Sequence, residues 1–197
     1  MKTLVIALAS TLILGSCGVL EPVKDTQINH LLEATIPDRR ITGSSPTIAI
    51  ARPALPSYLD REQLVSRSGN GQLQMNSYHL WAEPLDAAIS RVTATNLGRL
   101  TNSLNIQPVE SFVTLDYQSL LEIRISRFEA DASGQVVLEC TWKLQPVTGR
   151  IANTRSFTTT VPVSAADSAI TAAALTGRVT AMNEALARLA REISRAL

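Results

Sequence analysis

Two stretches of sequence, 120-LLEIRISRF-128 and 136-VVLECTWKL-144, decide the fold class because both have the residue pattern of strands. In the second stretch every other residue is apolar: Val136, Leu138, Cys140, Trp142 and Leu144. This period of two is typical of an antiparallel strand with one buried face. Residues 129–135 lie between the two stretches, and Gly134 suits a turn, so we expect the two strands to pair.

Further strands extend this pair in both directions along the chain. The β-branched run 155-RSFTTTVPV-163 follows Gly149 and predicts the third strand of a meander. Upstream, 47-TIAIA-51 predicts a buried strand, and 29-NHLLEAT-35 predicts a short first strand. Residues 63–68 and 72–79 flank Gly69-Asn70-Gly71, which predicts a hairpin because Gly and Asn accept positive φ at little cost.

Two helices complete the expected fold. Pro84 suits a helix start, and apolar residues spaced by three or four then continue to about Ser103. The second helix is predicted from Ser164 to Leu197, with an apolar stripe of about two and a half heptads that favours packing on the domain's own sheet over a coiled coil with a partner. We therefore expect one α+β domain, with a mostly antiparallel or mixed sheet and two main helices on one face.

Composition agrees with one globular domain and excludes some functions. The chain has 197 residues, of which 45% are hydrophobic and 18% charged, so an intrinsically disordered chain is excluded. The formal net charge of +1 gives no basis for nucleic-acid binding. The two cysteines cannot form a disulfide-rich scaffold, and they lie too far apart in sequence for a clustered metal site.

The N-terminus has the pattern of a secretory signal that ends in a lipidated cysteine. Lys2 precedes an apolar stretch from Thr3 to Leu14 that is too short to span a bilayer, and Gly15-Ser16-Cys17 follows. This order resembles the lipobox of bacterial lipoproteins, which implies cleavage between Ser16 and Cys17. An ordinary signal peptide with an incidental cysteine is the alternative. We expect residues 1–16 to be the signal, 17–28 to be a lipidated N-terminus and flexible tether, and 29–197 to be the domain.

No residue pattern indicates catalysis or a bound cofactor. His30 and His79 have no partner at the sequence spacing of a metal site, and His79 is expected to be structural. Cys140 is expected to be a buried core residue, because it shares the apolar side of its strand. We expect no enzyme activity, no metal and no cofactor other than a diacylglycerol and an N-linked acyl chain (palmitate) on Cys17.

Two motifs together resemble one protein family. The segment 56-PSYLDR-61 lies after an early strand, and 80-LWAEPLD-86 opens the first helix. With the lipobox and the long C-terminal helix, this pattern resembles the ABC-type transport auxiliary lipoprotein family, the PqiC-like proteins. Both motifs also have an architectural interpretation, in which Trp81 seats the helix on the sheet. Contact with a partner through Tyr58, Leu59 and Arg61 is the alternative.

The resemblance implies a non-catalytic accessory component of envelope phospholipid transport that supports outer-membrane integrity. Expected partners are MCE-domain proteins or ABC transporter components, together with the membrane itself and further copies of the chain. Gly18 in place of aspartate implies the periplasmic face of the outer membrane, by resemblance to Gram-negative lipoproteins. The alternatives are a lipoprotein cofactor of a cell-wall synthase or secretion machine, and an anchored periplasmic hydrolase. The hydrolase predicts a polar cleft that gathers His30 or His79 with acids and a serine.

Overall fold

The fold was analysed in a computed structural model that describes residues 27–38, 40–111, 116–164 and 172–197. The signal segment, with Ser16 and Cys17, lies outside the described residues. The second helix was predicted from Ser164, which is not helical; residues 165–171 lie outside the described residues, and the described helix spans Ala172–Ser194. Within the described part of the chain, no helix is both long and apolar enough to cross a membrane. The elements follow the chain in this order: β1 (Ile28–His30), β2 (Ile48–Ile50), β3 (Gln63–Arg67), β4 (Leu73–Trp81), α2 (Leu85–Thr101), β5 (Ile106–Pro108), η1 (Val109–Ser111), β6 (Ser119–Ala130), β7 (Gln135–Pro146), β8 (Arg155–Pro162) and α3 (Ala172–Ser194).

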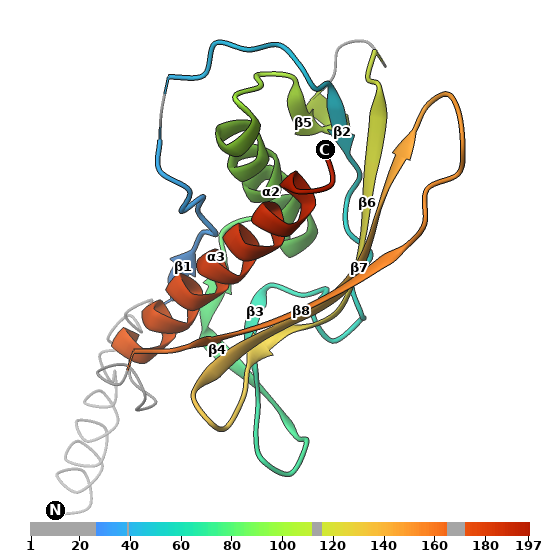
Figure 1. The fold of residues 1–197 in the computed structure, drawn as a ribbon. Coiled ribbons are helices and arrows are strands. Elements are labelled where there is room, and N and C mark those ends of the chain that lie inside the picture. The colour runs from blue at the N-terminus through green and yellow to red at the C-terminus, as the bar shows by residue number, and fades with distance from the viewer. Residues whose placement is uncertain (1–26, 39, 112–115, 165–171) are drawn as a thin grey trace, which may run out of the picture.

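The strands form one mixed sheet of eight strands centred on β6 (Figure 1). The meander β6–β7–β8 is antiparallel, as predicted. On its other edge, β6 pairs in parallel with two strands. Strand β2 pairs with the first residues of β6, and β3 pairs with its last residue. The β3–β4 hairpin is also antiparallel as predicted, whereas β1 joins β4 and β5 joins β2 in parallel. The sheet is therefore mixed, and β5 is a strand that the sequence analysis did not identify.

Both helices pack on the sheet and on each other (Figure 1). Helix α2 contacts α3 and β5, while α3 contacts β6, β7 and β8. The apolar stripe of α3 is buried against the sheet, with Leu186, Leu189 and Ile193 all fully covered. This confirms the expected α+β fold and the interpretation of the C-terminal stripe as core. Among the described residues, the buried residues of the core lie between Leu32 and Ile193, and a chain that begins at Gly18 retains all of them.

Strands β4, β6 and β7 are longer than predicted, whereas the strand predicted over residues 29–35 ends at His30 and the one predicted over 47–51 spans only Ile48–Ile50. Strand β6 also contains a bulge. Strand β6 continues through Glu129 to Ala130, whereas the sequence analysis placed Glu129 in the connecting turn. The register of β6 shifts between Ile125 and Arg127, opposite β7. Ile125 is buried in the core before the shift and Phe128 after it, so the extra residue moves the core side from odd to even positions. Glu129 therefore points to the sheet face opposite the core.

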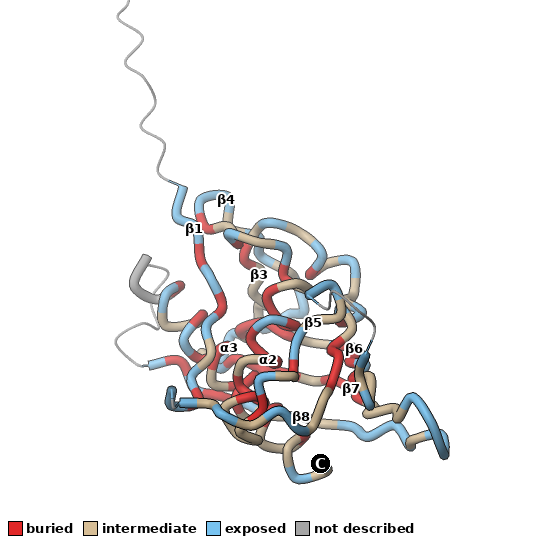
Figure 2. The backbone as a smooth tube through the Cα atoms, turned by 90° about the horizontal axis from the view of Figure 1, so that it is seen from above, coloured by how far each residue is buried: buried red, intermediate tan, exposed pale blue. Residues whose placement is uncertain are grey.

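Polar side chains of α2 and α3 bind the segment after β1. Buried and exposed residues alternate along this segment (Figure 2). Leu32 and Ile36 are buried there, although the segment has no regular secondary structure beyond His30. Four helix side chains bond its main chain: Arg91 to Leu32 O at 2.8 Å, Asn183 to Glu33 N at 2.9 Å, Asn96 to Ile36 N at 3.1 Å, and Arg99 to Ile36 O at 2.8 Å. We call residues 31–36 the strap.

Candidate functional site

The two family motifs meet in space. The chain leaves β2, runs beside β6 as far as Ala54, and then turns outward through residues 56–61 before β3 begins. The main-chain N–H of Trp81 donates to the carbonyl of Glu62 at 2.7 Å, which ties the second motif to the end of the first. A groove of about 290 Å³ lies between them, lined by Asp60, Arg61, Glu62, Trp81, Ala82, Glu83, Pro84 and Leu85.

The three residues proposed for partner contact occupy different environments. Leu59 is only 2% exposed and belongs to the core, which is the position that the architectural interpretation requires. Tyr58 is half-buried and turns its hydroxyl toward β6. Arg61 lines the groove and places one terminal nitrogen 2.7 Å from the sulfur of Met75. Of the three, Arg61 is the one that remains available at the groove.

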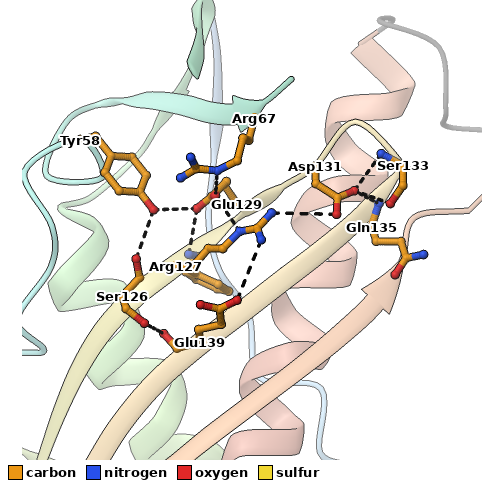
Figure 3. Close-up of polar contacts among 10 residues, drawn as sticks. Tyr58, Arg67, Ser126, Arg127, Glu129, Asp131, Ser133, Gln135 and Glu139 are labelled. Carbon is orange, nitrogen blue, oxygen red and sulfur yellow. Dashed lines mark hydrogen bonds and ion pairs between the residues drawn. The ribbon is translucent and has the colours of Figure 1, made fainter. Parts of the chain in front are cut away.

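The hydroxyl of Tyr58 donates a hydrogen bond to the buried carboxylate of Glu129, which lies on the sheet face opposite the helices (Figure 3). The side chain of Glu129 has no exposed surface. Its Oε1 accepts from Arg67 Nε at 2.7 Å and from Arg127 Nε at 3.0 Å. Its Oε2 accepts from Tyr58 Oη at 2.9 Å and from the main-chain N–H of Phe128 at 3.0 Å. We call Glu129 with Tyr58, Arg67 and Arg127 the Glu129 cluster.

The geometry of this cluster is structural rather than catalytic. Each oxygen of Glu129 already accepts two hydrogen bonds, so the carboxylate has little remaining capacity to take a proton from a substrate. Burial, and then the charge of Glu129, raises the pKa of Tyr58 to about 12, so the phenol stays protonated and donates. The cluster therefore fastens the first motif to β6 and β3 by charge-assisted hydrogen bonds.

Sequence reasoning missed this cluster. Glu129 was assigned to a turn, and nothing local pairs it with Arg67, which lies 62 positions earlier in the chain. One available signal was the acid flanked by Phe128 and Ala130 at the end of an otherwise regular strand. An acid in an apolar stretch is rarely buried without partners.

The fold also brings together the two histidines, which are 49 positions apart. His30 on β1 and His79 on β4 form a ring-to-ring hydrogen bond of 2.8 Å, and both are buried. Burial, and then proximity to His79, lowers the pKa of His30. The pair joins the edge strand β1 to the sheet, and among the described residues no group of three or more His, Cys, Asp or Glu side chains is placed to hold a metal ion.

Cys140 lies in the core on β7, as predicted, and is 4% exposed. Burial raises the pKa of its thiol to about 12. A thiol in this environment is a poor nucleophile at neutral pH, because the reactive thiolate is almost absent.

Comparison with known proteins identifies relatives by family and by fold. A crystal structure of an uncharacterized protein matches at 17% identity with a TM-score of 0.64, covering 85% of this chain and 99% of that one. The crystal structure of protein XCC0632 from Xanthomonas campestris, of family DUF330, matches at 19% identity with a TM-score of 0.62, covering 84% and 92%. A PelC dodecamer from Paraburkholderia phytofirmans is more distant, at 12% identity with a TM-score of 0.37, covering 77% and 93%. No curated protein matches the sequence.

The family assignment rests on a match that covers most of the chain. The model of the family described as "ABC-type transport auxiliary lipoprotein component" matches residues 30–194. This range includes both motifs, the Glu129 cluster and both described helices. The chain belongs to the ABC-type transport auxiliary lipoprotein family.

Proposed function

We propose that this protein is a non-catalytic docking component of an envelope phospholipid transport system. It is held by acyl chains on Cys17 at the periplasmic face of the outer membrane, where it supports membrane integrity. Its partners are an MCE-domain protein or components of an ABC transporter, and further copies of the chain accompany it in the assembly. The family description, an auxiliary transport lipoprotein, supports the general role.

The observation that carries the docking role is the meeting of the two motifs in one groove. Trp81 and Leu85 give the groove an apolar floor, and both are largely buried. Asp60 and Glu62 are exposed beside it, and neither forms an ion pair with any described residue. Arg61 also lines the groove, and it forms no ion pair with any described residue. Charged groups that have no partner within their own chain remain available to a partner protein.

A photo-crosslinking experiment in intact cells tests this role. A photoreactive amino acid replaces Glu62 in the groove or, as the control, Glu33, which is exposed on the strap. We expect the Glu62 position to crosslink an MCE-domain or ABC transporter component, and the Glu33 position to give less of that product. Crosslinks from Glu62 to a cell-wall synthase or secretion component, or equal products from both positions, would contradict the proposal.

The anchor is tested separately by mass spectrometry of the mature N-terminus. We expect a peptide that begins at Cys17 and carries a diacylglycerol and an acyl chain, recovered with the outer membrane after separation on a density gradient. An unmodified thiol at Cys17, or recovery with the inner membrane, would contradict the anchor or its location.

A further inference from the structure

A second pocket lies between the β3–β4 hairpin and the N-terminal half of α3. None of its lining residues also lines the motif groove. Its volume is about 280 Å³. Its walls are mostly apolar and are formed by Leu64, Val65, Met75, Ala130, Leu175 and Met182. Met75 is 48% exposed, so an apolar side chain lies at the open side of the pocket.

One cation lines this pocket without a counter-ion. Arg178 on α3 is partly buried, and no described residue forms a hydrogen bond or an ion pair with it. The other two arginines of α3, Arg188 and Arg191, share Glu184, and Arg195, just after the helix, binds Glu192. Burial lowers the pKa of the Arg178 guanidinium, and no neighbouring carboxylate opposes that effect.

A partly desolvated charge without a partner destabilises the folded chain. No carboxylate among the described residues compensates for this cost, so a guanidinium in this pocket is suited to bind an anion. Arg61 strengthens this interpretation, since its guanidinium reaches the sulfur of Met75 and likewise has no carboxylate partner among the described residues. Arg61 thus contacts Met75, the most exposed apolar residue of the pocket, while Arg178 lines the same pocket.

We propose that this pocket binds an anionic amphiphile, with a carboxylate or phosphate head on Arg178 and a hydrocarbon chain along Met75, Leu175 and Met182. The volume is at the small end of the range for ligand pockets, which suits one hydrocarbon chain rather than two. A guanidinium binds carboxylate and phosphate groups through paired N–H donors, so either head is chemically suitable. This binding site goes beyond the docking role. The pocket and the motif groove share no lining residue, although Arg61 of the groove contacts Met75 of the pocket.

Isothermal titration calorimetry with soluble probes tests the site on residues 18–197, which retain the whole core. Octanoate and hexyl phosphate, below their micellar concentrations, supply the two anionic heads, and hexyltrimethylammonium is the cationic control. We expect both anions to bind and the cation not to bind. Tighter binding of hexyl phosphate would identify a phosphate-bearing lipid as the ligand type, and tighter binding of octanoate would identify a fatty acid.

Variants assign the binding to Arg178. Arg178→Gln is expected to weaken anion binding about tenfold or more, as the loss of a charge-assisted hydrogen bond predicts. Arg178→Lys should retain part of the affinity, and Arg195→Gln, at the far end of α3, should retain all of it. Because Arg178 has no partner, its replacement by Gln should leave the melting temperature equal or higher, whereas a structural arginine would lower it.

A variant at the pocket mouth keeps the test decisive if Arg178→Gln folds poorly. Met75 is exposed, so Met75→Asp should fold, and its negative charge should weaken anion binding. Wild-type affinity in Arg178→Gln or in Met75→Asp would overturn the proposal. Equal binding of the cation, or the absence of binding by either anion at millimolar concentration, would also overturn it.

Discussion

Replacement of Glu129 by alanine is expected to destabilise the domain strongly. The change leaves Arg67 and Arg127 without their shared carboxylate and the Phe128 N–H without its acceptor, and it leaves the Tyr58 hydroxyl with only the longer 3.4 Å bond to the carbonyl of Ser126. Removal of one partner from a buried ion pair costs about 3–5 kcal/mol. The two arginine side chains are 30% and 25% exposed, so water can solvate them in part, which favours the lower half of that range. For a domain of this size a cost of about 3–4 kcal/mol should lower the melting temperature by roughly 6–16 °C.

The assay is urea and thermal unfolding of residues 18–197, followed by circular dichroism. Glu139→Ala is the matched control, since Glu139 lies 3.9 Å from Arg127, its side chain is 42% exposed, and such pairs contribute about 0–1 kcal/mol. Tyr58→Phe removes one hydrogen bond to a buried charge and should cost about 1.5–3 kcal/mol. The combined variant Tyr58→Phe/Glu129→Ala should cost less than the sum of the two changes, because both remove the same contact. The reasoning is refuted if Glu129→Ala and Glu139→Ala have the same effect, or if Glu129→Ala costs less than about 1 kcal/mol.

Three further outcomes follow from single features. Burial, and then His79, lowers the pKa of His30 in the folded state. The neutral imidazole therefore contributes to stability above the unfolded-state pKa near 6.5, and this contribution is lost as pH falls toward the folded-state pKa. Unfolding midpoints from pH 8 to 5 should show the loss, and His30→Gln should reduce it. Cys140 is buried, so it should react with a thiol reagent at pH 8 only as fast as the domain opens, and the labelling rate should rise with urea concentration. Fast labelling of the native protein would contradict this burial. Gly43→Ala should lower the melting temperature by several degrees, since an added Cβ would lie 2.2 Å from the carbonyl oxygen of Asn102, and a wild-type melting curve would show that this contact relaxes.

The antiparallel part of the fold could be predicted because its signals are local. The signal for β7 is the alternation of apolar and polar residues over 136–144, and the signal for the hairpin is the Gly-Asn-Gly turn at 69–71. Both involve only neighbouring residues, and the structure confirms the meander and the hairpin. The parallel pairings could not be predicted in this way, because the partners lie far apart in sequence. Strand β5 has three residues and ends at Pro108, so it carries almost no periodic signal.

The candidate site was predictable only in outline. The two motifs could be recognised in the sequence, but their meeting in one groove depends on the path of residues 51–54 beside β6 and on the bond between Glu62 and Trp81. Glu129 points away from the core because of the bulge between Ile125 and Arg127, and no local pattern predicts a bulge there. The pairing of His30 with His79 likewise depends on a parallel register between β1 and β4.

The strap has a mechanical consequence for a chain held by its N-terminus. Tension from an anchor at Cys17 would reach the described chain at β1, which has only three residues and pairs with β4 alone. Beyond β1, the pull would act on the four side-chain bonds that hold residues 31–36 to α2 and α3. Because these bonds come from both helices, the force would be shared between them before it reached the sheet core. The bonds of β1 would therefore be loaded first, and the load would reach the motif groove directly, because His30 pairs with Trp81 and its carbonyl accepts from the main-chain N–H of Ala82 at 2.9 Å.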